Sequence, residues 1–534
     1  MGRSPLFRNL SRAISIAHYC QAHKISTSEG MERIAALEFF RSNRREFLAS
    51  MGKLTVVGAA LGVGSGQLHH AWAAPPSVDA KVAIVGAGLA GLACAYELKR
   101  KGITATLFDA SNRVGGRCYS LSGKFPGQVV ERGGELIDNL HKTLLGYVNE
   151  FNLKTEDLSK QPGEVFYYFN GMRYPESAVV DEFRQFVSVM RTDLRSLSSA
   201  PTADNHTEAD KRLDLLSLQD YLDSRQAGKL IKSVIKSAYI AEYGLEIDQQ
   251  SCLNFLLFIH ADKRSKFTPF GVFSDERYHV IGGNQQIAEG LRDRLPGQIN
   301  FGKQLSAVRK DSAGKIELTF ADGATGKYDA VVLAIPFTTL RQVKLDASLG
   351  LPPWKLSAIQ NFGYGTNAKM MVGFNGRPWT SWGSNGSSYS DLPNLQCTWE
   401  TNPQNATTSN AVLTDYLGGQ LGKNINPKNI QPAALSFLQD LDRVFPGTLS
   451  AAKLTNNTVL AHLEHWPSNP LALGSYTCNR PGYFTTIAGN EGKAIGNLYF
   501  AGEHTNSFYE WQGFMEGAAV SGIQAANQIL NPVK

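Results

Sequence analysis

The sequence lacks long hydrophobic segments and closely spaced cysteines. No stretch after residue 74 approaches the 18 continuous apolar residues that a membrane-spanning helix requires. The chain has 6 cysteines in 534 residues, and none forms a Cys-x-x-Cys pair, so their spacing indicates neither a metal site nor a disulfide framework. We therefore expect a mature protein without a membrane span and without a metal centre.

Outside its N-terminal region, the chain also lacks an excess of charge of either sign. Residues 1–73 hold 9 of the 53 Lys and Arg and 4 of the 47 Asp and Glu, which leaves 44 basic and 43 acidic residues in the remainder. This balance does not indicate a nucleic-acid-binding protein. Hydrophobic residues make up 43% and charged residues 19%, as in ordinary globular proteins, and the length indicates more than one domain.

The N-terminal region has the features of an export leader. Arg44 and Arg45 are followed by a Gly/Ala-rich apolar run at 54–64 and by the A-x-A sequence at 71–73. This order resembles a twin-arginine signal, so we expect residues 1–73 to be a leader read by the twin-arginine export machinery. The mature protein would then be periplasmic or extracellular. The alternatives are a hydrophobic linker with a chance arginine pair, and a true start at Met31 in place of Met1.

Beyond the leader, residues 81–109 have the pattern of a strand, a helix and a second strand. The glycines of a G-x-G-x-x-G motif, Gly86, Gly88 and Gly91, join the first strand to the helix. They permit a tight turn, close approach of a pyrophosphate to the backbone, and close helix–strand packing. Asp109 ends the second strand, where an acid can bind ribose hydroxyls. A structural glycine turn without a ligand is the alternative.

The sequence D-A-S-N-R-V-G-G-R continues this motif at 109–117. Gly116 allows a second close backbone approach, and Arg113 and Arg117 can neutralise a diphosphate. Further on, residues 181–260 have long helical patterns and residues 303–335 alternate short strands with Asp-Gly turns. The order predicts two interleaved domains, one binding a nucleotide and one binding a substrate.

The motif at 81–117 and the sequence Y-F-A-G-E-H-T-N-S-F-Y-E-W-Q-G-F-M-E-G-A at 499–518 resemble the two ends of the flavin-containing amine oxidase family, which includes flavin monoamine oxidases and L-amino acid oxidases. The resemblance extends over most of residues 80–530. It implies an α/β fold in which a Rossmann-like FAD-binding domain is interleaved with an α+β substrate-binding domain. The expected division is FAD-binding parts at 74–145, 276–345 and 461–534, a helical substrate part at 146–275 and a second substrate part at 346–460.

The resemblance also implies cofactor contacts away from the first motif. Gly134 lies in a segment, 129–138, expected to pass the flavin ring, and Val308 matches a residue whose backbone contacts the adenine. Gly502 and Glu503 fall where the family binds the flavin ribityl chain, and Met515 begins a helix whose positive end would face the flavin. A capped turn at Glu503 and a plain core residue at Val308 are the alternatives. Ser475 stands where some members attach flavin through cysteine, so we expect non-covalent FAD.

The expected catalytic residues are implied by the same resemblance. Lys369 matches a lysine that holds a water at the flavin, and Tyr476 and Phe514 would form an aromatic cage with Trp511 nearby. A strand-edge lysine and ordinary core aromatics are the alternatives. Glu135 either attracts an ammonium group or is a buried acid hydrogen-bonded to the backbone, and the sequence favours neither.

The expected reaction is the oxidation of a primary amine or polyamine by hydride transfer to flavin, with O2 as electron acceptor and hydrogen peroxide as product. An L-amino acid oxidase, for basic amino acids among others, is the second hypothesis. A flavin desaturase and a non-catalytic flavoprotein are the remaining alternatives. The expected partners are thus a small amine or amino acid and O2, and a homodimer is left open.

Overall fold

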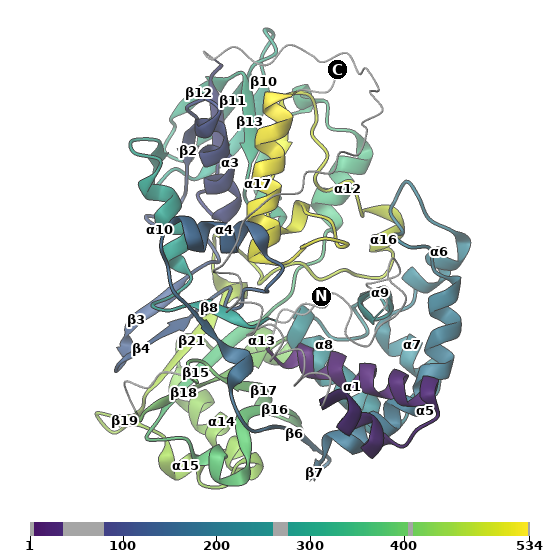
Figure 1. Ribbon diagram of the computed structural model, residues 1–534. Helices are drawn as coiled ribbons and strands as arrows, with labels where there is room; N and C mark the ends of the chain where they lie inside the picture. The colour runs from purple at the N-terminus through teal and green to yellow at the C-terminus, as the bar shows by residue number, and fades with distance from the viewer. Residues whose placement is uncertain (1–4, 36–79, 260–275, 404–408, 532–534) are drawn as a thin grey trace, which may run out of the picture.

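The computed structural model describes residues 5–35, 80–259, 276–403 and 409–531. It shows a mixed α/β architecture, which confirms the predicted fold class at this level (Figure 1). Arg44, Arg45 and the A-x-A sequence at 71–73 lie outside the described residues. Among the described residues, no helix has the length and apolar character needed to cross a bilayer. All six cysteines are buried and none is in a disulfide.

A five-stranded parallel sheet collects strands from three distant parts of the chain. Its order is β22 (Leu498–Phe500), β13 (Ala330–Leu333), β1 (Val82–Val85), β2 (Thr106–Phe108) and β9 (Ile299–Asn300). β1, β13 and β22 are wholly buried and apolar, as expected for strands covered on both faces. The three segments predicted to bind FAD each contribute to this sheet. The exact domain boundaries stay a prediction.

Two helices from opposite ends of the chain pack side by side on this sheet, as Figure 1 shows: α3 (Leu89–Arg100) and α17 (Met515–Leu530). A Cβ atom on Gly522 of α17 would come within 2.0 Å of the Ala90 carbonyl oxygen of α3, so the glycine is required for this close approach. α4 (Lys142–Glu150) and α10 (Gln285–Asp293) lie beside them. A second sheet follows in the order β12 (Thr325–Tyr328), β11 (Ile316–Phe320), β10 (Leu305–Lys310) and β14 (Lys344–Leu345).

A seven-stranded sheet forms the other half of the molecule. Its order is β21 (Ala461–His465), β15 (Ala368–Phe374), β18 (Ala411–Leu417), β17 (Leu395–Glu400), β16 (Ser384–Leu392), β6 (Glu164–Phe169) and β7 (Met172–Tyr174). Neighbouring strands are antiparallel except β16 and β6, which are parallel. The helices α14 (Ile430–Val444) and α15 (Thr448–Ala451) pack beside it, and α13 (Gly419–Asn424) follows β18.

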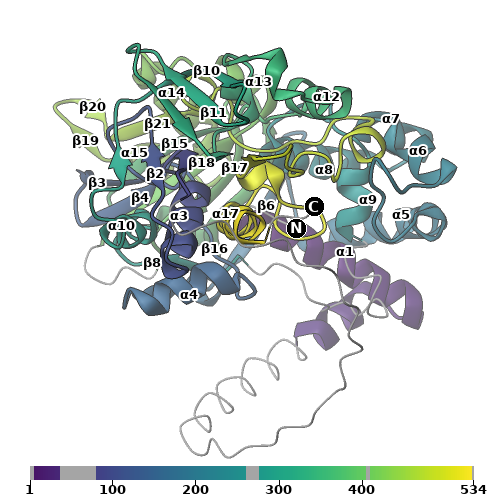
Figure 2. The ribbon, with the colours of Figure 1, turned by 90° about the horizontal axis from the view of Figure 1, so that it is seen from above.

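The remaining elements include the helical part predicted at 181–260. It contains α5 (Glu176–Ser196), α6 (Glu208–Asp214), α7 (Leu218–Ser224), α8 (Lys229–Tyr243) and α9 (Leu253–Ile259). Figure 2 shows these helices together on one side of the molecule. The short elements are β3 (Ser120–Phe125), β4 (Gln128–Glu131), β5 (Thr155–Asp157), β8 (Tyr278–Val280), β19 (Leu454–Thr455), β20 (Thr458–Val459), α11 (Phe337–Leu340), α12 (Pro353–Asn361) and α16 (Tyr483–Thr486), and the 3₁₀ helices η1 (Leu158–Lys160), η2 (Ala347–Leu349), η3 (Pro378–Trp382), η4 (Trp466–Ser468) and η5 (Glu503–Thr505).

The start of the chain forms a helix that packs into this helical part. α1 (Pro5–His23) lies against α5 and also contacts α8 and β17. Its Leu10, Ile14, Ile16 and Cys20 are at most 2% exposed and belong to the same apolar cluster as Phe183 of α5. This packing was not expected of a leader segment.

Polar contacts also attach the segment around α1 to α5. Arg12 pairs with Glu176, and Thr27 is hydrogen-bonded to Asp181. The Arg184 guanidinium donates to the Ile25 carbonyl oxygen at 2.8 Å and to Thr27 Oγ1 at 2.7 Å. The segment is therefore held by both apolar burial and hydrogen bonds.

Replacing a buried residue of α1 tests whether this helix belongs to the folded protein. Ile14→Asp places a charge in the apolar cluster and should reduce the free energy of unfolding by about 3 kcal/mol. Thermal unfolding of the full chain should then begin at least several degrees lower. Gln21→Asp, at an exposed position of the same helix, is the matched control and should change the free energy by less than about 1 kcal/mol. Equal stability of both variants would mean that α1 is dispensable.

Candidate active site

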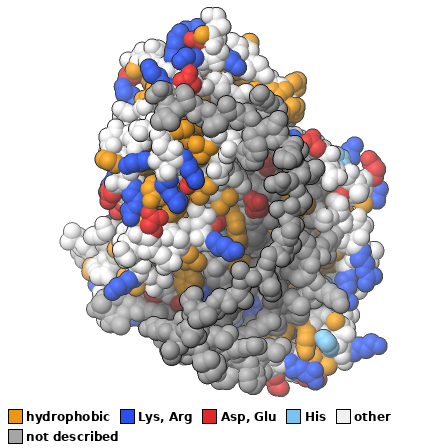
Figure 3. Space-filling view, turned by 45° about the horizontal axis from the view of Figure 1, so that its top comes forward, with side chains coloured by type: hydrophobic (Ala, Val, Ile, Leu, Met, Phe, Trp, Pro, Cys, Tyr) orange, Lys and Arg blue, Asp and Glu red, His pale blue; other side chains and the backbone are white. Residues whose placement is uncertain are grey.

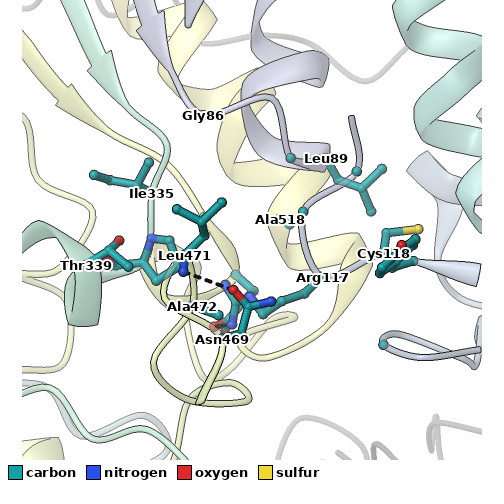
Figure 4. A pocket seen from close by; sticks show the side chains of 18 of the residues that line it. Gly86, Leu89, Arg117, Cys118, Ile335, Thr339, Asn469, Leu471, Ala472 and Ala518 are labelled. Atoms are coloured by element: carbon teal, nitrogen blue, oxygen red, sulfur yellow. Dashed lines mark hydrogen bonds and ion pairs between the residues drawn. The ribbon is translucent and has the colours of Figure 1, made fainter. Parts of the chain in front are cut away.

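One cavity of about 630 Å³ lies between the parallel sheet and the seven-stranded sheet. Figure 4 looks into it, with Gly86, Leu89 and Ala518 on one side and Ile335 and Thr339 on the other. Fifteen of the residues singled out from the sequence line this cavity: Gly86, Gly88, Asp109, Arg113, Gly116, Arg117, Gly134, Glu135, Lys369, Ser475, Tyr476, Gly502, Glu503, Phe514 and Met515. Gly91, Val308 and Trp511 do not line it.

At one end of the cavity, the glycine motif leaves backbone N–H groups that can bind an anion. Gly88 precedes α3 and leaves the helix N-terminus without a side-chain cap, so backbone N–H groups of the first turn are available to a ligand. A Cβ atom on Gly88 would have one neighbour within 4 Å, the Gly115 carbonyl oxygen at 3.9 Å, so the space in front of it is open. Gly91 has the packing role expected from the motif, because a Cβ atom there would lie 1.8 Å from the Gly86 carbonyl oxygen.

Asp109 stabilises the loop that follows β2. Its carboxylate accepts hydrogen bonds from Ala87 N at 2.6 Å and from Ser111 N and Oγ at 2.8 and 2.6 Å. Arg113 donates to the Val114 and Gly116 carbonyl oxygens and stacks on Tyr119, with its guanidinium 3.5 Å from the ring centroid. These contacts hold the R-V-G-G-R loop beside the open helix terminus.

Arg117 and Glu503 connect the first and last motifs of the chain. Arg117 Nη1 donates to Glu503 Oε1 and to the Ser475 carbonyl oxygen, both at 2.8 Å, and Thr477 Oγ1 donates to Glu503 Oε2 at 2.6 Å. Burial acts to raise the pKa of Glu503, but Arg117 and these hydrogen bonds outweigh it and hold that pKa below its ordinary value. The charge of Arg117 is thus matched within the protein.

A second uncapped helix terminus faces the cavity. α17 begins at Met515, and its N-cap Phe514 provides no side-chain hydrogen bond. A Cβ atom on Gly134 would lie 2.7 Å from Met515 Cγ, so the segment at 129–138 runs against the start of α17. The positive end of this helix can stabilise negative charge at this end of the cavity.

Lys369 and Glu135 form a buried ion pair in the cavity wall. Lys369 Nζ lies 2.7 Å from Glu135 Oε2, and both side chains are 5% exposed. Nζ also donates to the carbonyl oxygens of Gly133 at 2.9 Å and Glu131 at 3.1 Å. Glu135 Oε1 accepts from Trp399 Nε1 at 2.9 Å. Glu135 is therefore a buried acid, and within the described part of the chain its carboxylate is bonded to the side chains of Lys369 and Trp399, partners that neither sequence interpretation named.

Tyr476 is held at the cavity wall by its hydroxyl group. The hydroxyl donates to the Glu242 carbonyl oxygen at 2.6 Å, so the 2.7 Å contact between Tyr476 and Tyr416 requires Tyr416 to be the donor. Tyr416 pairs directly with Lys369 across β15 and β18, which places both side chains on one face of the sheet.

Phe514 lines the cavity, whereas Trp511 supports it from behind. The Trp511 ring meets Phe514 edge to face at a centroid distance of 5.8 Å and meets His141 at 4.5 Å. Burial lowers the pKa of His141 to about 3, so this imidazole is neutral. Val308 is fully buried in β10, and its neighbours Leu305 and Ser306 line the cavity.

Sequence reasoning missed several residues of the cavity wall: Trp399, Tyr416 and Glu276. Trp399 lies on β17, in the sequence L-Q-C-T-W-E, and Tyr416 lies on the neighbouring strand β18, in A-V-L-T-D-Y-L. Residues two apart in a strand share a face, but the sequence does not indicate which strands are neighbours.

Known proteins with a similar sequence or a similar fold include proteins described as oxidases. A family model described as flavin containing amine oxidoreductase matches residues 89–530. An L-amino-acid oxidase of Pseudechis australis is 22% identical over 468 residues, which cover 84% of this chain and 86% of that protein. Cyclohexylamine oxidase from Brevibacterium oxydans IH-35A superimposes with a TM-score of 0.73 at 18% identity, covering 85% of this chain and 99% of that chain. Putrescine oxidase bound to putrescine gives 0.71 at 19% identity, covering 84% and 98%.

The contact between Arg117 and Glu503 should be required for the two motifs to meet. Arg117→Ala leaves a buried carboxylate without its partner, so the free energy of unfolding should fall by about 3 kcal/mol. The amount of flavin that copurifies should fall as well. The double variant Arg117→Ala/Glu503→Gln should regain part of the stability, as measured by urea unfolding. A single variant as stable as the wild type would contradict the assignment.

His504 should make the protein less stable in acid. Burial lowers its pKa to about 3 from an ordinary 6.5, and neither ring nitrogen has a hydrogen-bond partner among the described residues. Below pH 6.5 the unfolded chain binds a proton that the folded chain does not, so stability falls by about 1.4 kcal/mol per pH unit toward pH 3. Between pH 7 and pH 5 the wild type should lose about 2 kcal/mol more than His504→Phe in urea unfolding. Equal losses would exclude this role.

Proposed function

Because this chain belongs to the flavin-containing amine oxidoreductase family, we propose that it oxidises a primary amine with non-covalently bound FAD and passes the electrons to O2. The observation that supports this most is the composition of one end of the cavity. Tyr476, Phe514, Trp399 and Tyr416 line that end, together with the ion pair of Lys369 and Glu135. Aromatic walls of this kind accept an apolar amine and disfavour its charged form.

The described residues fit FAD along the length of the cavity. The open N-terminus of α3, with Gly88 and Gly116, would hold the diphosphate, and Asp109 would hold the adenosine ribose. Gly502 and Glu503 would contact the ribityl chain, and the start of α17 at Met515 would face the ring. Ser475, in place of a cysteine, is consistent with non-covalent binding.

The residues of this chain would bind and orient the amine. When bound, the flavin would accept a hydride from the carbon that bears the nitrogen and then reduce O2 to hydrogen peroxide. Tyr476, fixed by the Glu242 carbonyl oxygen, and Phe514, backed by Trp511, limit the amine to the space between them and exclude water. The resulting imine hydrolyses to a carbonyl compound and ammonia.

An L-amino acid oxidase is the second candidate, and relatives such as that of Pseudechis australis favour it. This activity requires a cation for the substrate carboxylate. Among the described residues that line the cavity, Arg113 and Lys303 lie beside the glycine motif and Asp109. Arg117 is paired with Glu503, and Lys369 is paired with Glu135. The primary amine is therefore the first candidate. The pairing of Glu135 also removes the reason to favour a polyamine.

A peroxide-coupled screen of the purified yellow protein tests the proposal. Monoamines, diamines, polyamines and the twenty L-amino acids are offered under the same conditions, and we expect peroxide from primary amines. Turnover of L-amino acids alone would support the second candidate. No turnover with any nitrogen compound, together with no anaerobic bleaching of the flavin, would contradict both.

Removing the Tyr476 ring should reduce turnover of the preferred amine. Tyr476→Ala opens the cage on one side, so kcat/KM should fall by about 10²-fold because the amine is no longer oriented. Tyr476→Phe keeps the ring and loses the hydroxyl contacts to Glu242 and Tyr416, so a loss within about tenfold is expected. Steady-state kinetics with flavin content as the control measures both. Equal losses of kcat/KM in the two variants would show that turnover depends on the hydroxyl group and not on the ring.

A further inference from the structure

The ammonium group of Lys369 has no proton left to donate into the cavity. A lysine ammonium has three N–H donors. Three acceptors lie within hydrogen-bond distance of Nζ: Glu135 Oε2, the Gly133 carbonyl oxygen and the Glu131 carbonyl oxygen. The role implied by the family resemblance, a lysine that holds a water, would require one of these contacts to open.

The carboxylate of Glu135 is held on both sides. Oε2 accepts from Lys369 at 2.7 Å and Oε1 accepts from Trp399 Nε1 at 2.9 Å. Trp399 is 4% exposed, so this second contact is sheltered from solvent. A buried ion pair fixed in this way contributes a dipole to the cavity wall but no net charge.

We propose that Glu135 is a positioning residue that holds Lys369 and cancels its charge at the aromatic end of the cavity. This inference rests on the proposed flavin site. Without the carboxylate, a positive charge would remain in the wall that the flavin ring and the amine share. Such a charge stabilises the anionic reduced form of a flavin and opposes the approach of a cationic substrate.

Four variants separate this role from a structural one. Glu135→Gln keeps the size of the side chain and removes its charge, while Glu135→Asp keeps the charge. Lys369→Met removes the opposite charge, and Glu135→Gln/Lys369→Met removes both. For each protein, the midpoint potential of the bound flavin is measured by reductive titration, with flavin content and thermal unfolding as controls for folding.

Glu135→Gln should shift the equilibrium of flavin reduction toward the reduced form about tenfold, which is about 30 mV for a two-electron couple. Lys369→Met should shift it in the opposite direction. The double variant should return to within about threefold of the wild type, because the pair contributes no net charge. Glu135→Asp should resemble the wild type.

A shift caused by Glu135→Gln that persists unchanged in the Lys369→Met background would overturn the proposal, since Glu135 would then not act through Lys369. An unchanged potential in folded, flavin-loaded Glu135→Gln would overturn it as well. If Glu135→Gln does not fold, comparison of Glu135→Asp and the double variant with the wild type still tests the cancellation. Either one departing more than about threefold would contradict it.

The proposed function is tested separately by anaerobic addition of amine to the wild type. Failure of the amine to bleach the flavin would contradict the function and leave the measured potentials intact. If the amine bleaches the flavin of the wild type but the Glu135 and Lys369 variants have the same flavin potential as the wild type, only the proposed role of Glu135 is contradicted.

Discussion

The pairing of Arg117 with Glu503 is the contact on which the rest of the site depends. It joins residues 386 positions apart and includes the Ser475 carbonyl oxygen and Thr477. The loop after β2, the strand end at β22 and the segment that carries Tyr476 therefore meet at one point. Because Glu503 is buried, the position tolerates a carboxylate only where a cation and hydrogen-bond donors compensate it. The nucleotide end and the aromatic end of the cavity are aligned by this single group of contacts.

The aromatic end is built on a rigid support. Lys369, Tyr416 and Trp399 project from neighbouring strands of the seven-stranded sheet, which fixes their spacing through the hydrogen-bond register. Phe514 comes from the other half of the molecule, at the start of α17, and is backed by Trp511. The substrate space thus lies between two sheets that each hold one wall. On the face that Figure 3 shows, basic and acidic side chains are interspersed among the described residues, in agreement with the balanced charge of the chain beyond residue 73.

Local motifs could be predicted from the sequence, and contacts between distant strands could not. The G-x-G-x-x-G and R-V-G-G-R motifs predicted the turns that they form. The family that they indicated is confirmed, and so is the class of enzyme, an oxidoreductase acting on CH–NH2 groups. Trp399 and Tyr416 were missed because their place in the wall depends on the pairing of β17 with β18 and of β18 with β15. Glu135 was left open for the same reason, since its partners Lys369 and Trp399 lie more than 230 residues away. The role of Val308, the binding of FAD without a covalent bond and export stay predictions.

The packing of α1 has a consequence for the covalent integrity of the protein. The described contacts of residues 5–35 with the helical part do not depend on the peptide chain that links residue 35 to residue 80. Hydrolysis of one peptide bond in that stretch would therefore give two polypeptides that stay associated, with the native mass unchanged on a sizing column and a short fragment released only by denaturant. One gene would then encode the equivalent of a heterodimer, and N-terminal sequencing of the intact complex would give two sequences.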